Sequence, residues 1–370
     1  MSERDRTPRR LRRAPALTGI RAVAIGLVIL VHTNISAAQG GWIGVDVFFV
    51  LSGFLITALL LNEHDANGRF SIPKFYVRRI LRLVPAYWAF LLIVTVWAAI
   101  WRSGQFGIWS SEVVKSATYQ LNFFDINHFP QIGIGQTWSL AIEEQFYLVW
   151  PLFLLVGLKL MPRRAFMGLV VGGIVASFLA TVVMAHHGVS YRRLYYGLDT
   201  NALPLLVGCL AGFLYIGGYG RKISPRLSAL TPFVTMAVLA LFLVSVPESS
   251  EWAYEGPIQL VSLLMAATLI ALLLNSNSWT SRVLAHPGIV WIGLISYSLY
   301  LWNPFAMLIA RNLATGTVGR VLHLLLGLIL TFVFGIASYY LVERSGNRLK
   351  DRFEVYRGAG APSPAGPTHV

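Results

Sequence analysis

Long apolar stretches alternate with short polar segments along almost all of the 370-residue chain. A helix needs about 20 mostly apolar residues to cross the hydrocarbon core of a bilayer. Ten stretches meet this length, some of them interrupted by polar residues: 16–36, 42–62, 80–101, 138–160, 165–185, 201–217, 228–246, 258–275, 288–310 and 321–342. The pattern predicts an all-α polytopic membrane protein with about ten transmembrane helices.

These stretches divide the chain into three parts. Residues 1–15 form a basic arm, residues 16–345 the transmembrane domain, and residues 346–370 a tail whose end is expected to be disordered. The first stretch lacks a small-residue cleavage motif, so it is expected to be retained as a helix and not removed as a signal peptide. Segment 102–137 is the one outer connection large enough to act as a lid or docking surface.

Composition supports membrane insertion. Hydrophobic residues make up 56% of the chain and charged residues only 12%, about half of the ~25% that a soluble domain carries. The net charge of +14 is spread over short clusters between apolar stretches, a pattern typical of topology signals and not of a nucleic-acid platform. Cys209 is the one cysteine, which excludes an internal disulfide.

Basic residues also predict the orientation. With a cytoplasmic N-terminus, 23 of the 30 Lys and Arg residues fall on inner segments and six on outer loops, while Arg21 lies inside the first helix. Positive charge collects on the cytoplasmic side of membrane proteins. We therefore expect both termini in the cytoplasm and a multi-pass position in the inner (cytoplasmic) membrane.

Ionisable residues at bilayer depth are costly and require an explanation. Arg21 and His32 share one face of the first helix, about 16 Å apart, with His32 nearer the outer side. A very short connection to the second helix is expected to put Asp46 at the same depth as His32. Ser139 and Glu143, four residues apart, share a face of the fourth helix. We therefore expect one polar layer in the outer half of the bilayer, and its members are His32, Asp46, Ser139 and Glu143.

Several functions fit such a layer. A buried neutral imidazole oriented by an acid is a general base. The same residues could instead hold helices together, or relay protons in a transporter, although the chain shows no inverted repeat. Ser139 is a possible nucleophile, but no helix-borne histidine is spaced to activate it.

A pair of arginines marks the inner side. Arg79 and Arg82 are three residues apart and share one helix face. Two guanidinium groups on one face suit a phosphorylated ligand, because Arg binds phosphate oxygens bidentately. Anchoring at the cytoplasmic interface is the competing interpretation.

Five strings, in order along the chain, carry a family resemblance. They are Leu17-Thr-Gly-Ile-Arg-Ala-Val-Ala with His32, Gly44-Val-Asp-Val-Phe-Phe-Val-Leu-Ser-Gly-Phe, Phe75-Tyr-Val-Arg-Arg-Ile-Leu-Arg, Thr137-Trp-Ser-Leu-Ala-Ile-Glu-Glu-Gln-Phe-Tyr and Ile295-Ser-Tyr-Ser-Leu-Tyr-Leu-Trp. Together they resemble the acyltransferase 3 family of bacterial integral-membrane O-acyltransferases, over nearly the whole chain.

The resemblance implies an activity: transfer of an acyl group, usually acetyl, from a cytosolic donor such as acyl-CoA to a hydroxyl. Acceptors in the family are typically sugars of surface glycans or glycosylated metabolites. It implies that His32 is catalytic, as a general base or as a nucleophile that forms an acyl-imidazole. Arg21 would accompany it, and Arg79 and Arg82 would hold the CoA phosphates. Besides acyl-CoA, the acceptor and the lipid bilayer, the expectation includes no metal and no nucleic acid.

Two positions depart from the family pattern. The ninth-helix string ends in Asn303, where the family commonly has histidine, and Asn201 stands where the family often has arginine. An asparagine can hydrogen-bond but does not exchange a proton near neutral pH. Any role of a ninth-helix histidine therefore does not transfer to this chain, and recognition near Asn201 is expected to differ.

Overall fold

The computed structural model describes residues 14–124, 132–219, 224–313 and 316–350, and all of its regular elements in these ranges are helical. Ten helices within them are long and apolar enough to cross a membrane, which confirms the predicted fold class. The spans are α1 (Pro15–His32), η2 with α2 (Ser36–Ile43 and Gly44–Asn67), α3 (Ile72–Trp101), α6 (Thr137–Leu160), α7 (Arg163–His186), α9 (Leu198–Ile216), α10 (Pro225–Ser245), α11 (Pro257–Leu274), α13 (Pro287–Leu313) and α14 with the π-helical η6 (Gly316–Ser338 and Tyr339–Glu343).

Short elements lie between or after the spans. They are η3 (Ser103–Gln105), α4 (Phe106–Ala117), α5 (Leu121–Phe124), α8 (Tyr191–Tyr196), η5 (Glu251–Glu255), α12 (Trp279–Leu284) and α15 (Arg344–Lys350). The segment expected to act as a lid, 102–137, therefore contains two short helices, although its residues 125–131 lie outside the described ranges. The predicted basic arm and disordered tail end also lie outside them, at 1–13 and 351–370.

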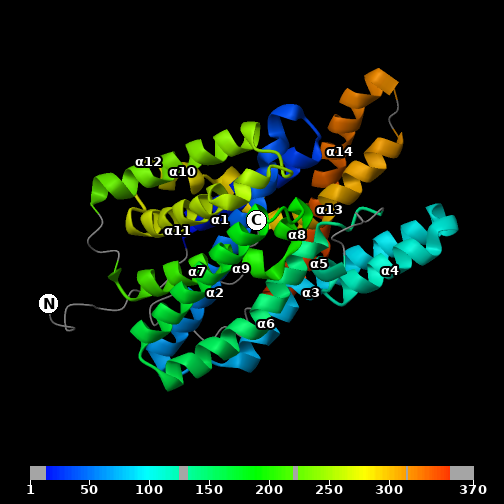
Figure 1. The fold of residues 1–370 in the computed structure, drawn as a ribbon. Coiled ribbons are helices and arrows are strands. Elements are labelled where there is room, and N and C mark those ends of the chain that lie inside the picture. Colours follow the sequence, from blue (N-terminus) through cyan, green and yellow to red (C-terminus); the bar gives the residue numbers. More distant parts are fainter. Residues whose placement is uncertain (1–13, 125–131, 220–223, 314–315, 351–370) are drawn as a thin grey trace, which may run out of the picture.

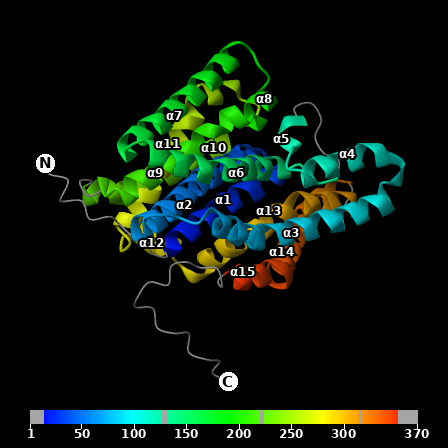
Figure 2. The same ribbon diagram turned by 90° about the horizontal axis from the view of Figure 1, so that it is seen from below.

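Helices α1 and α2 occupy the middle of the bundle. Figures 1 and 2 show α3, α13 and α14 on one side of this pair and α10 and α11 on the other. Helix α1 packs along α13, and α2 packs along α9. The two central helices can therefore present polar side chains to a space enclosed by protein instead of lipid.

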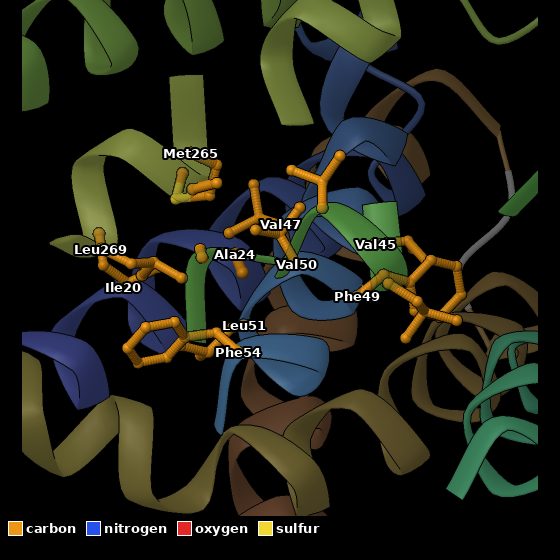
Figure 3. Packing of buried hydrophobic residues seen from close by; sticks show 14 of the residues in the cluster. Ile20, Ala24, Val45, Val47, Phe49, Val50, Leu51, Phe54, Met265 and Leu269 are labelled. Atoms are coloured by element: carbon orange, nitrogen blue, oxygen red, sulfur yellow. The ribbon is translucent and has the colours of Figure 1, made fainter. Parts of the chain in front are cut away.

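Close packing around α2 depends on small residues. Gly53 of α2 lies against the Leu205 carbonyl of α9, and Gly208 of α9 lies against the Val50 carbonyl of α2, so a Cβ at either position would meet backbone. Large apolar side chains such as Phe54 fill the adjoining core (Figure 3). This close approach of the two helices follows from the missing side chains.

The connection between α1 and α2 folds back along α1. Its 3₁₀ segment, η2, places Gly41 against Leu27, and the start of α2 places Gly44 against Ala24 and Val28. Because α2 runs inward from there, Asp46 lies about two turns deeper than His32, the last residue of α1. The expected common depth of His32 and Asp46 is therefore wrong, since η2 re-enters the bundle instead of forming a simple surface loop.

Helix α3 begins earlier than the apolar pattern indicated. Ser71 caps its N-terminus and accepts a hydrogen bond from the Lys74 backbone N–H at 3.4 Å. Arg79, which precedes the predicted stretch 80–101, consequently lies inside the same span as Arg82.

Candidate active site

A cavity of about 450 Å³ lies between α1, α2, α3, α6 and α13. Along α2 its lining extends from Val45 to Glu63, eighteen residues and therefore about 27 Å. The Glu63 end lies beside Arg78 and Phe75 at the start of α3, and the Val45 end lies beside Ser139 and Tyr300. The cavity therefore runs through much of the bundle, from a basic end toward a hydroxyl-bearing end.

Five of the seven predicted site residues line this cavity: Arg21, Arg79, Arg82, Ser139 and Glu143. They come from α1, α3 and α6, which are far apart in the sequence. His32 and Asp46 are not among the lining residues, although Val45 and Phe49, which flank Asp46 on α2, are. The structure thus brings the three arginines together with Ser139 and Glu143. The predicted polar layer is divided, because its other two members do not line the cavity.

Glu144 neutralises Arg79. The Arg79 guanidinium donates to both carboxylate oxygens of Glu144, through Nε at 3.2 Å and Nη2 at 2.8 Å. Its Cζ also lies 3.1 Å from the ring centroid of Tyr147, where it stacks on the aromatic face. Arg79 is therefore held in place by Glu144 and Tyr147, and Glu144 pairs its charge through two of its five N–H donors.

Glu143 is fixed by two hydroxyl groups. Ser52 Oγ donates to its carboxylate at 2.8 Å, and Tyr147 OH donates at 3.4 Å. Both consecutive acids of α6 thus have internal partners, Glu143 with α2 and Glu144 with α3. These partners explain how both acids tolerate bilayer depth.

Ser139 belongs to a hydroxyl pair at the other end of the cavity. Its Oγ lies 2.5 Å from Tyr300 OH of α13, and both hydroxyls are close to the Gln136 carbonyl, at 3.2 and 3.1 Å. No histidine lines this cavity within the described ranges. Ser139 therefore resembles a positioning group more than an activated nucleophile.

Arg21 and Arg82 differ from Arg79. Over the residues that the structure covers, neither makes a hydrogen bond or an ion pair, although Arg21 lies within electrostatic range of Arg82 and Glu343. Glu343 is 2% exposed, lies on the π-helical turn η6 and accepts a hydrogen bond from Ser298 Oγ at 2.8 Å. Two cationic groups in the cavity are thus available to a ligand.

His32 ends α1 and is half-buried. Its Nδ1 lies 2.7 Å from the Val28 carbonyl oxygen, which can only accept, so Nδ1 carries the proton and a neutral ring leaves Nε2 as an acceptor. Asp46 is 6% exposed, and no hydrogen bond joins it to His32 within the described part of the chain. The backbone of α1, not an acid, therefore orients the imidazole.

An aromatic cluster closes the bundle near Asp46. Trp42 stacks on Tyr254 at 6.0 Å and meets Tyr195 edge-on at 5.7 Å, while Trp138 lies 4.6 Å from Tyr195. Trp138 also contacts Phe49, a cavity-lining residue. Since Tyr195 belongs to α8 and Tyr254 to η5, these rings connect the cavity wall at Phe49 with both segments.

Several residues of the site were not predicted from the sequence. Ser52, Tyr147 and Tyr300 lie inside strings that were singled out for neighbouring residues, and Tyr147 follows Glu143 by one helical turn, a spacing that could have identified it. Glu343 lies one residue past the predicted end of the last span, 321–342. No sequence signal connects it to the cavity, because its proximity to Arg21 depends on tertiary packing.

A polytopic bundle with arginines, carboxylates and hydroxyls in one internal cavity is consistent with a membrane enzyme that acts on an anionic substrate. Comparison with known proteins identifies the class of enzyme. The model of a protein family described as "Acyltransferase domain" matches residues 15–340. The chain belongs to this acyltransferase family, as its five strings predicted. Membership favours acyl transfer over the transporter hypothesis.

Its relatives include O-acetyltransferases. The peptidoglycan O-acetyltransferase OatA of Listeria monocytogenes is 33% identical over 89% of this chain and 55% of its own length. The putative peptidoglycan O-acetyltransferase YrhL of Bacillus subtilis is 33% identical over 89% and 54%, and a putative O-acetyltransferase of Staphylococcus aureus (strain COL) is 30% identical over 90% and 57%. The chain thus spans little more than half the length of these relatives. No solved structure matches it.

Proposed function

We propose that this chain transfers an acetyl group from acyl-CoA to a hydroxyl of a carbohydrate acceptor in the inner membrane. The cavity carries this proposal, because it extends from an arginine-bearing end to a hydroxyl-bearing end within one bundle. A CoA-like donor is matched to these two ends, because it carries phosphates at one end and the thioester at the other. The names of the relatives favour acetyl as the group and a glycan as the acceptor.

The donor would lie with its phosphates toward the arginines. Arginine binds phosphate oxygens in charge-assisted pairs, and burial strengthens such pairs. The lining from Phe48 to Leu60 of α2 is largely apolar and would exclude water around the arm of the donor. Thioester hydrolysis, the competing reaction, would be suppressed by this exclusion.

His32 would act as the general base in this proposal, although it does not line the cavity, so the acceptor hydroxyl would have to lie between His32 and the hydroxyl-bearing end. Its Nε2 removes the proton of the acceptor hydroxyl while the hydroxyl oxygen bonds to the acyl carbon. The carbon–sulfur bond breaks, and the thiolate of CoA takes up a proton to leave as the thiol. In the alternative, Nε2 attacks the acyl carbon itself, and the acceptor then cleaves the acyl-imidazole.

The test is acetyl transfer by the full-length chain in lipid nanodiscs, with acetyl-CoA and a soluble glycan acceptor such as a chitooligosaccharide. His32→Ala is expected to lower kcat by about 10²- to 10⁴-fold, the usual loss for a general base. His187→Ala is the matched control, because His187 is an exposed histidine after α7, away from the cavity. Equal turnover by wild type and His32→Ala would remove His32 from the mechanism.

A further inference from the structure

Ser296 of α13 is the one cavity-lining residue in the described ranges whose buried side-chain hydroxyl has no hydrogen-bond partner. Its exposed fraction is 0%. A serine inside a helix can return its hydroxyl to the carbonyl four residues earlier, but Ser296 does not. Since buried hydroxyls are nearly always paired, this one points to a partner that occupies the cavity.

Ser296 lies beside Arg21. Gly293 of α13 packs directly against the Thr18 carbonyl of α1. These helices are the first and ninth of the ten spans and therefore run in the same direction. Three residues further along each of them come Ser296 and Arg21, both of which line the cavity. A hydroxyl and a guanidinium thus face the same part of the cavity from neighbouring helices.

Arg82 adds a second positive charge. It lines the cavity within electrostatic range of Arg21, and two like charges so placed repel each other unless an anion lies between them. Glu143 and Glu343 act on Arg21 only at longer range, because no ion pair joins either to it in the described chain. Each of these acids instead accepts a hydrogen bond from a serine.

We propose that Ser296, together with Arg21, completes inside the cavity the phosphate-binding subsite that the family resemblance implies at Arg82. The two guanidinium groups bind phosphate oxygens, and Ser296 Oγ donates a hydrogen bond to one of them. Arg79 serves instead to hold α3 against α6 through Glu144. The phosphate is that of the CoA donor, so this source rests on the proposed function; a phospholipid headgroup is the other source with the same chemistry.

The experiment measures binding to the full chain in nanodiscs of zwitterionic lipid, with CoA and with pantetheine, which lacks phosphate. Ser296→Ala is expected to raise the Kd of CoA by roughly tenfold, as for one hydrogen bond to a charged group, and to leave the Kd of pantetheine unchanged. Arg82→Gln should raise the Kd of CoA by more than this. Ser262→Ala is the matched control, because this buried serine donates within its own helix, away from the cavity.

The outcomes separate the subsite from the proposed function. If Ser296→Ala weakens the binding of CoA and of pantetheine equally, or weakens neither, Ser296 does not bind the phosphate and the proposal is overturned, whatever the effect of Arg82→Gln. If folded wild-type protein binds no CoA and transfers no acetyl group, the proposed function fails. Phosphatidylglycerol is then titrated: thermal stabilisation that Ser296→Ala reduces supports the subsite with lipid as the source, and no such stabilisation overturns it.

Discussion

Single residues in this protein show how far side-chain chemistry can be inferred from spacing. Ser139 and Glu143 were predicted to share a face because they are four apart, and both line the cavity. Arg79 and Arg82, predicted to share one helix face, also line the cavity, but they do not act as a pair. Glu144 forms the ion pair with Arg79, and the sequence could not say which of two adjacent acids would do so.

Glu248 should make the stability depend on pH. It lies in the connection between α10 and η5, outside the spans, where burial raises its pKa to about 7 and nearby Arg192 only partly offsets this. A raised carboxyl pKa means that the folded protein keeps a proton that the unfolded chain has lost. Stability should therefore fall by about 1–3 kcal/mol as pH rises from about 4.5 to about 7.

The measurement is the Tm in nanodiscs across this pH range. Glu248→Gln, which stays neutral, should remove most of the decline. Glu251→Gln, at an exposed position three residues later, should retain it. An unchanged slope in Glu248→Gln would show that another group causes the pH dependence.

At the scale of elements, the length of the apolar stretches predicted all ten spans, because a helix must reach that length to cross a bilayer. It could not predict η2, whose eight residues fold back into the bundle and shift Asp46 inward. Nor could it predict the amphipathic α4, which lies in a segment expected to be a loop. Such elements depend on the surfaces that surround them, and these exist only once the spans have packed.

The crossing of α2 and α9 should be sensitive to one methyl group. In Gly53→Ala the new Cβ would meet the Leu205 carbonyl, and rigid backbone cannot move aside as a side chain can. Separation of the helices is expected to cost about 1–3 kcal/mol of stability, measured as a lower Tm. Gly172→Ala is the control, because this helix-interior glycine of α7 faces open space and should be neutral or stabilising. Equal Tm values for both variants would contradict the packing argument.

At the scale of the whole molecule, orientation decides which end of the cavity meets the donor. The charge distribution predicts that the Glu63–Arg78 end faces the cytoplasm, where acyl-CoA is made, and that the α8 end faces outward. Neither the cavity nor the helix packing tests this prediction, since both are the same for an inverted bundle. The orientation therefore requires a measurement of its own.

Cysteine labelling in intact cells provides this measurement. Cys209 is fully buried, so the parent chain should not react with a membrane-impermeant maleimide. His187→Cys, at an exposed position after α7, should be labelled from outside. Asn67→Cys, exposed at the end of α2, should be labelled only after the cells are made permeable. The reverse pattern would turn the arginine-bearing end of the cavity outward, and a cytosolic acyl-CoA could then no longer enter beside Arg78.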